Sequence, residues 1–199
     1  MQYFCDMAKD EKLEIVYSTL FQLIDSVKLK GWCIHMVCMQ GEGFFTYDGR
    51  QFHVKKYDAV VINAARRVHV VGQSEDLKVE VLAAPNDFLS NQLPANNYGI
   101  GGDISLYDNP VIPLSEADAE TLVRDIHNIR DRIADTGHLF YRELIGGLAL
   151  PLIYDLFYFH ARNSTPIYAT DRSMYVVREL MALLESGRSK KYRKVSYLC

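Results

Sequence analysis

The chain has 199 residues, a formal net charge of −3 at pH 7 and a hydrophobic content of 49%, which suit one sizeable soluble domain or two small ones. It contains no apolar run long enough to span a membrane, and its first residues lack the basic and apolar regions of a signal peptide. We therefore expect a cytoplasmic protein with no membrane partner. Its four cysteines form no C-x-x-C pair, so reduced thiols are favoured over a disulfide framework or a cysteine zinc site.

Residues 32–83 alternate short apolar, β-branched and aromatic runs with turns that contain Gly and Asp. This pattern is typical of an all-β barrel or sandwich. Asp48-Gly49 favours a two-residue type I′ turn, so residues 44–47 are predicted to pair antiparallel with residues 51–54. Six short strands in this window predict a compact barrel, whose mouth can hold one small molecule.

Less regular stretches flank this region. Residues 13–24 are rich in β-forming residues and predict one or two further strands. Between Pro85 and Pro113, Asn, Gly, Asp and Pro accumulate. This composition predicts a loop that connects two differently built halves.

After Pro113 the hydrophobic period changes from two residues to about 3.6, which predicts helices. Ser115 is expected to cap the first helix and Gly137 to end it. The apolar stripe of this helix comprises Leu122, Ile126, Ile129 and Ile133. A third helix is predicted over residues 171–186, and the basic run at residues 188–194 is typical of a solvated tail.

The second helix, predicted over residues 139–160, is apolar around most of its circumference. Such a helix must be buried on more than one side, so we expect a homodimer in which two copies pack through it. An ordinary core helix is the alternative. Pro151 is expected to bend or divide the helix, because it removes one hydrogen bond of the helical ladder. The expected dimerisation residues are Leu144, Leu148, Leu152 and Leu156.

Three stretches of the chain resemble parts of one known family. The segments G-E-G-F-F-T-Y-D-G-R-Q-F-H-V-K-K-Y-D-A-V-V-I-N and S-E-D-L-K-V-E-V-L are similar to the cupin sensor domain of that family, the AraC-type transcription regulators. The segment E-L-M-A-L-L-E-S-G-R-S-K-K-Y-R-K-V-S-Y-L-C is similar to the start of its helix-turn-helix DNA-binding domain. Many family members have Gly before a strand-leading Asp, whereas this chain has Tyr57 before Asp58. We therefore expect that turn to be built differently.

The resemblance implies an α+β fold, in which a cupin-like antiparallel β-barrel of the jelly-roll type precedes a helical linker and dimerisation region. It divides the chain into a sensor barrel (residues 1–112), a helical linker (113–165) and the incomplete start of a helix-turn-helix domain (166–199). The implied function is small-molecule sensing and dimerisation in a transcription regulator. DNA is expected to bind only through the part of the DNA-binding domain that this sequence lacks.

The barrel interior is the expected ligand site, because alternate strand residues point inward. The first strand offers either Trp32, Ile34 and Met36 or Cys33, His35 and Val37, and the sequence leaves this choice open. Aromatic walls with a few polar tips suit a small metabolite such as a sugar. The expected ligand-binding residues are Trp32, His35, Phe44, Tyr47, Phe52 and His69.

Two alternatives remain open. The first is a metal-dependent cupin enzyme, an isomerase or oxygenase, which needs three or four converging ligands. The chain offers His35, His53 and His69 without the H-x-H spacing and nearby Glu of such sites. We therefore expect no metal ligand, no cofactor and no catalytic residue. The second alternative is a dimerisation module whose barrel is filled by its own side chains.

Overall fold

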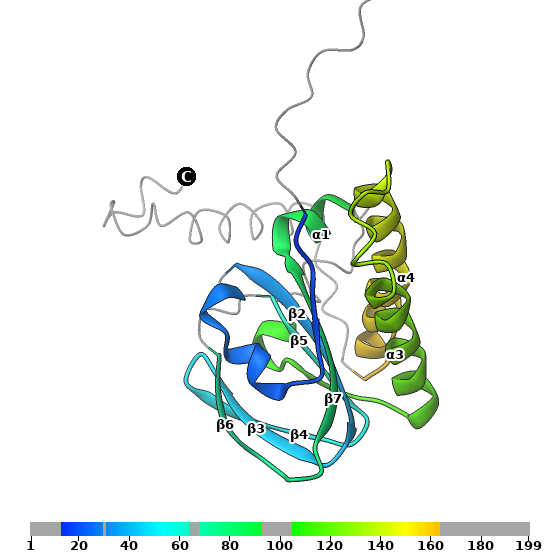
Figure 1. Cartoon of the computed structure of the whole chain (residues 1–199). Helices are drawn as coiled ribbons and strands as arrows, with labels where there is room; N and C mark the ends of the chain where they lie inside the picture. Colours follow the sequence, from blue (N-terminus) through cyan, green and yellow to red (C-terminus); the bar gives the residue numbers. More distant parts are fainter. Residues whose placement is uncertain (1–12, 30, 64–67, 93–104, 164–199) are drawn as a thin grey trace, which may run out of the picture.

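The computed structural model describes residues 13–29, 31–63, 68–92 and 105–163. The predicted third helix, the basic run and the start of the helix-turn-helix domain lie outside the described residues. Within them, antiparallel strands form two facing sheets, and two long helices lie side by side along one sheet (Figure 1). The fold is therefore of the α+β class that the sequence predicts.

The described part of the chain contains a five-stranded and a three-stranded sheet. The larger sheet has the spatial order β1 (Val16–Ser18), β7 (Lys78–Pro85), β2 (Trp32–Gln40), β5 (Asp58–Ile62) and β8 (Val111–Pro113). The smaller sheet has the order β4 (Arg50–Lys55), β3 (Glu42–Tyr47) and β6 (Val68–Gln73). The helices are η1 (Phe21–Asp25), η2 (Val27–Leu29), α1 (Asn86–Gln92), α3 (Glu116–Arg130) and α4 (Tyr141–Asn163).

The predicted barrel is not closed, because across the described residues the strands form two separate sheets with no ladder between their edges. At one side, η1 lies against the edge strand β6. The Asp25 carboxylate there accepts a hydrogen bond from the Val70 amide at 3.2 Å. Asp25 thus satisfies an edge donor that a closing strand would otherwise take. The result is a sandwich of two sheets.

The region of closely spaced turns folds as predicted, into the six strands β2 to β7 within the described parts of residues 32–85. β3 and β4 form the expected hairpin, in which Tyr47 pairs with Arg50. Asp48 and Gly49 have φ values of 51° and 78°. These positive values are the ones that a two-residue type I′ turn requires, so the predicted turn is confirmed.

The turn between β4 and β5 keeps a backbone conformation that glycine favours, although Tyr57 occupies the position. Its φ of 68° lies in the left-handed region, which costs a residue other than glycine about 1 kcal/mol. The Tyr57 amide donates to the Cys38 carbonyl at 2.7 Å, and its own carbonyl accepts from the Leu114 amide at 3.0 Å. These contacts hold Tyr57 in the strained conformation.

Residues 13–24 form one strand and then a 3₁₀ helix rather than a second strand. After β1, the Ser18 hydroxyl accepts a hydrogen bond from the Leu20 amide at 3.0 Å, and the chain turns into η1. A 3₁₀ helix has about three residues per turn, so Phe21 and Ile24 point the same way. Both are buried between the sheets, which explains why a helical turn replaces a strand here.

The stretch between Pro85 and Pro113 was predicted as a loop, but its described residues include a helix and a strand. α1 follows β7 directly and buries Phe88 and Leu89. Further along, β8 adds an edge strand beside β5. A strand of three residues is too short to show a hydrophobic period, so its pairing with β5 depends on the rest of the sheet.

α3 begins and packs as predicted. Ser115 and Asp118 form a capping box at its start. Three residues of the predicted stripe are fully buried, namely Leu122, Ile126 and Ile129. The helix ends at Arg130 rather than at Gly137, because the chain turns after Asp131, whose amide closes the last helical hydrogen bond at 2.9 Å.

α4 runs through Pro151 without the predicted division. Pro151 and Gly147 both lie on the exposed side of the helix. The Gly147 carbonyl, which loses its helical donor to the proline ring, can therefore bond to water. The helix tolerates the proline because the affected hydrogen bond faces solvent.

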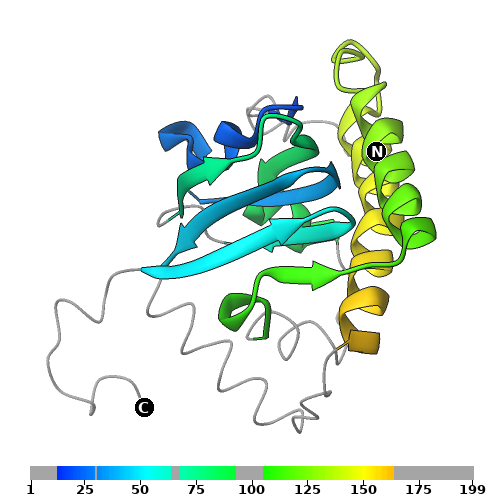
Figure 2. The same ribbon diagram turned by 90° about the horizontal axis from the view of Figure 1, so that it is seen from below.

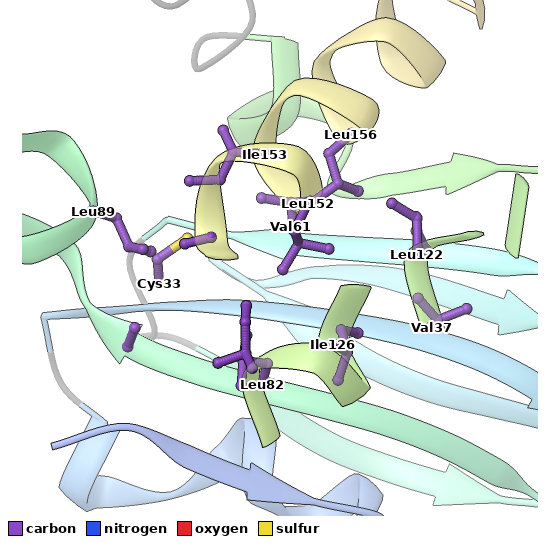
Figure 3. Packing of buried hydrophobic residues seen from close by; sticks show 14 of the residues in the cluster. Cys33, Val37, Val61, Leu82, Leu89, Leu122, Ile126, Leu152, Ile153 and Leu156 are labelled. Atoms are coloured by element: carbon purple, nitrogen blue, oxygen red, sulfur yellow. The ribbon is translucent and has the colours of Figure 1, made fainter. Parts of the chain in front are cut away.

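The five-stranded sheet is buried on both faces. Its inner face contacts the smaller sheet, and α3 and α4 lie along its outer face (Figure 2). On β2, Trp32, Ile34 and Met36 point into the inner core, so the choice that the sequence left open is decided. The outer core joins the sheet to the helices and includes Cys33, Val37, Val61, Leu82, Ile126 and Leu152 (Figure 3).

We expect Gly49→Ala to destabilise the fold by about 1 kcal/mol, because alanine resists the positive φ at this position. A Cβ at Gly49 would meet no neighbouring atom within 4 Å, so steric contact does not contribute. Gly137→Ala is the matched control, since that position has free space and no positive φ. It should change the free energy of unfolding by less than about 0.5 kcal/mol. Urea unfolding measures both, and equal effects would contradict the argument from strain.

Candidate functional site

One end of the sandwich, which we call the basal end, gathers the start of β2, the β3–β4 turn and the start of β8. Trp32 pairs with Pro85, the last residue of β7, and Tyr47 pairs with Val68, the first residue of β6. A short turn connects the end of β6 to the start of β7. The first residue of β6 and the last of β7 therefore lie at the same end, together with Trp32 and Tyr47.

Three of the predicted ligand-binding residues meet near the basal end. Trp32, Tyr47 and Phe52 all pack into the inner core. Trp32 and Phe52 are partly exposed, whereas Tyr47 is only 2% exposed. Burial raises the pKa of Tyr47 to about 12, and the nearby Tyr107 and Asp48 contribute to the shift. The Tyr47 hydroxyl therefore keeps its proton at neutral pH.

The other three predicted residues point elsewhere, because successive side chains of a strand alternate between its faces. His35 faces the helices. Phe44 faces outward from the smaller sheet and stacks on His53, with ring centroids 4.5 Å apart. The His69 side chain is 73% exposed and lies 3.3 Å from the Asp25 carboxylate. The structure therefore does not bring these three residues to the basal end.

Arg50 and Tyr107 complete the basal end, and neither was predicted. The Arg50 guanidinium donates to the Asp108 carboxylate and to the Tyr107 carbonyl, each at 2.7 Å. It also lies over the Phe52 and Tyr107 rings, 5.6 and 6.0 Å from their centroids. The Tyr107 ring meets the Tyr47 ring edge-on at 5.6 Å. Arg50 directly follows the Asp-Gly turn, a signal that could have identified it, whereas Tyr107 lies in a stretch with no periodic pattern.

Deeper between the sheets the core is filled. Residues with 0% exposure there include Ile34, Phe45, Val54, Val60 and Ile62. A space large enough for a water molecule would leave part of the surrounding side chains accessible. A ligand therefore has no room beside these residues in this conformation, and the partly exposed rings of the basal end are the surfaces that it can contact.

A small polar cluster lies on the helix side of β2. The Cys33 thiol donates to Asn63 Oδ1 at 3.4 Å and lies 3.6 Å from His35 Nε2. His35 is buried, and its Nδ1 has no hydrogen-bond partner in the described part of the chain. Burial lowers the pKa of His35 to about 4. His35 is therefore a neutral core residue at physiological pH.

The three histidines considered for a metal site do not converge. His35 faces the helices, whereas His53 and His69 lie on the outer face of the smaller sheet. Among residues 13–29, 31–63, 68–92 and 105–163, no group of three or more His, Cys, Asp or Glu side chains is placed to hold a metal ion. Burial raises the pKa of the Cys38 thiol to about 11, so that thiol is a poor nucleophile.

The predicted dimerisation residues divide between two sides of α4. Leu152 (1% exposed) and Leu156 (4%) are buried in the chain's own core, and Leu148 packs against that core. Leu152 and Leu156 are therefore covered by their own chain, while Leu144 remains half-buried. The side of the helix that faces away carries Gly147, Leu150, Pro151, Tyr154 and Tyr158, which we call the α4 outward stripe.

α4 is also long and apolar enough, by length and composition, to cross a membrane, with a mean hydropathy of 1.4 over an 18-residue window. In this structure it packs along the five-stranded sheet, and 44% of that window is buried. Packing of this kind is what a core helix of a globular domain shows, and such helices pass the same test of length and composition.

We expect the free energy of unfolding to fall as the pH drops from about 6.5 to about 4, because in this range His35 binds a proton only in the unfolded chain. The lowered pKa corresponds to a loss of about 3 kcal/mol. His35→Leu should remove most of this dependence while leaving stability near pH 7.5 almost unchanged. His69→Leu, at an exposed position, is the control and should keep the wild-type dependence. Urea unfolding at several pH values decides, and a wild-type slope in His35→Leu would refute the assignment.

No family model matches the chain, and no curated protein matches it. Solved structures that it resembles share little sequence with it. The AraC-like transcriptional activator CuxR is 14% identical, with a TM-score of 0.47 over 94% of this chain and 65% of CuxR. ToxT from Vibrio cholerae O395 is 11% identical, with a TM-score of 0.42 over 94% of this chain and 64% of ToxT. EutQ from Clostridium difficile is 13% identical, with a TM-score of 0.24 over 37% of this chain and 46% of EutQ. The chain thus spans less than two thirds of the length of each.

Proposed function

We propose that the chain is the small-molecule-sensing and dimerisation domain of an AraC-type transcription regulator that acts in the cytoplasm. The sequence resemblance supports this proposal, and so does the order of the elements. A two-sheet sandwich comes first, and the packed helices α3 and α4 follow it. The start of the DNA-binding domain is assigned to residues 166–199, which lie outside the described residues.

The observation that carries the sensing role is the composition of the basal end. The rings of Trp32 and Phe52 are partly exposed at this end, where the Arg50 guanidinium also lies. The hydrogen-bond partners of Arg50, Tyr107 and Asp108, lie at the surface. Rings bind an apolar body, and a guanidinium binds polar or anionic oxygens. A ligand that combines the two, such as a sugar or another small metabolite, matches this set of side chains.

A dimerisation module without a ligand is the second candidate. The filled inner core favours it, because a sensor needs space that its ligand can enter. The two candidates differ in what they expect of the basal end. A sensor exchanges the contacts of Arg50 and Phe52 for contacts with a ligand, whereas a pure dimerisation module keeps them.

A ligand of the basal end should raise the melting temperature. At a hundred times its Kd it adds about 2.7 kcal/mol to the free energy of unfolding, a shift of about 5–10 °C for a domain of this size. A thermal-shift screen of sugars, organic acids and amino-acid derivatives measures this. Phe52→Leu should abolish the shift that a hit produces, whereas Phe44→Leu, the same change on the outward face, should keep it. If no compound raises the melting temperature, or if both variants respond alike, the dimerisation module is favoured.

The α4 outward stripe supports the dimer. It contains no charged side chain, and Tyr154 and Tyr158 are 41% and 60% exposed. Apolar patches of this kind mark protein contacts more often than free surface. A second copy of the chain is the occupant that we propose, because a helix can pack on its own symmetry mate with the same face.

Tyr154→Glu should convert the proposed dimer into monomers, because a charge buried at the contact costs several kcal/mol. Asn128→Glu, on the exposed side of α3, introduces the same charge away from the stripe and should leave the dimer intact. Light scattering over a range of concentrations should give twice the 22.8 kDa chain mass for the wild type. Leu152→Glu is unsuitable, since it would place the charge in the chain's own core. A wild-type chain that stays monomeric at every concentration would rule out the dimer.

A further inference from the structure

The segment of residues 105–118, which we call the strap, contacts both the basal end and the last turn of α4. It comprises a helical turn at residues 105–108, the strand β8 and the first residues of α3. In Figure 2, β8 runs from that helical turn toward the end of α4. The strap therefore connects the end of the sandwich at which a ligand is proposed to the helix that precedes residues 164–199.

At the basal end, the β3–β4 turn holds the strap by three side-chain hydrogen bonds. Arg50 donates to the Tyr107 carbonyl and to the Asp108 carboxylate, both at 2.7 Å. The Tyr107 hydroxyl donates to the Asp48 carboxylate. The Asp108 side chain is 81% exposed, so its ion pair with Arg50 competes with water and contributes little. These contacts can be exchanged without opening the core.

The middle of the strap is stiff. β8 pairs with β5 from Val111 to Pro113. The Pro110 carbonyl accepts from the Val61 amide at 3.0 Å, and the Leu114 amide donates to the Tyr57 carbonyl at 3.0 Å. Ile112 in the middle of β8 is only 1% exposed and belongs to the outer core. β8 is therefore fixed on the sheet, and the helical turn at residues 105–108 is the part of the strap that can move.

Three polar side chains in the last turn of α4 contact the strap. His160 Nε2 lies 3.2 Å from the hydroxyl of Ser105, the first residue of the strap. The Asn163 side-chain amide donates to the Pro113 carbonyl at 2.7 Å.

Arg162 makes the third contact, with the Asp118 carboxylate. The Arg162 guanidinium and the Ser115 hydroxyl hold the pKa of Asp118 below its ordinary value, so this pair is charged at neutral pH. Phe159, in the same turn, is buried in the outer core. This burial and the strap contacts together hold the last turn of α4 that the structure describes.

We infer that the strap couples the basal end to the last turn of α4, an inference that rests on the proposed sensing function. With Arg50 on the strap, the strap is docked and the last turn of α4 is fixed. A ligand that takes the Arg50 guanidinium leaves Tyr107 and Asp108 without it, and the helical turn at residues 105–108 is released while β8 stays on β5. Release removes the Ser105 contact of His160, and the last described turn of α4 loosens. The ligand shifts the balance between the two states by its greater affinity for the released one.

Hydrogen exchange of the whole chain tests the coupling without a ligand. Arg50→Gln removes the guanidinium from the strap and mimics release. We expect amides at residues 160–163 to exchange about tenfold faster in this variant, while amides of β2 stay at the wild-type rate. Arg132→Gln breaks the exposed contact of Arg132 with Asp135, at 2.9 Å near the opposite end of the helix pair. As the matched control it should leave residues 160–163 unchanged.

The coupling must also act in reverse, because thermodynamic coupling between two sites is reciprocal. Arg162→Gln should therefore speed exchange at residues 107–111, although Arg162 contacts none of them. Asp108→Asn, a mild change at an exposed position, should reproduce the Arg50→Gln effect on α4 in a weaker form. This variant keeps the coupling testable if Arg50→Gln does not fold.

Two outcomes overturn the inference. One is faster exchange in the strap of Arg50→Gln with unchanged exchange at residues 160–163. The other is an equal acceleration in α4 and β2, which reports loss of global stability rather than coupling. Neither outcome bears on whether a ligand binds, which the thermal-shift screen decides separately. A failed screen likewise leaves the exchange result standing as a property of the fold.

Discussion

Burial of the five-stranded sheet on both faces is the constraint on which the rest of the structure depends. Its central strand β2 is buried at every position from Cys33 to Cys38. Neither face of such a strand can meet water, so one face requires the smaller sheet and the other requires α3 and α4. Each fully buried Ile, Val or Leu contributes about 1.5–3 kcal/mol, which makes an arrangement that exposes either face uncompetitive. The smaller sheet that covers one face determines where the basal end lies. The helices that cover the other face determine where the α4 outward stripe lies.

Features that depend on a few neighbouring residues could be predicted from the sequence. Asp48-Gly49 specified its hairpin because few residues accept two successive positive φ values. Ser115 specified the start of α3 because its hydroxyl reaches the Asp118 amide three residues later. The strands β2 to β7 were predicted because turn residues separate them. In each case the information lies within a few residues of the feature, and no distant contact is needed.

Features that depend on distant contacts could not be predicted. The two faces of β2 are about equally apolar, with Cys33 and Val37 on one and Ile34 and Met36 on the other. Composition therefore could not assign His35 to the helix side. Tyr107 reaches the basal end because β8, which follows it, pairs with β5. The three residues of β8 are too few to show a hydrophobic period. The sequence thus identified the inner-facing aromatic residues of the candidate site but not its polar groups.

The leucines of α4 show how spacing along a helix decides which side chains a partner can reach. A helix has 3.6 residues per turn, so side chains four apart are rotated by about 40° at each step. Leu144, Leu148, Leu152 and Leu156 therefore wind from the outer side of the helix into the core: the first two are partly exposed and the last two are buried.

A set that stays on one side must alternate steps of three and four. Gly147, Leu150 or Pro151, Tyr154 and Tyr158 do so, and they form the outward stripe. The same helix thus has Leu152 and Leu156 in the chain's own core and Tyr154 and Tyr158 turned to the outside, and its last described turn contacts the strap. A movement of the strap would change the end of the surface on which a second copy is proposed to pack, so sensing and dimerisation would share one helix.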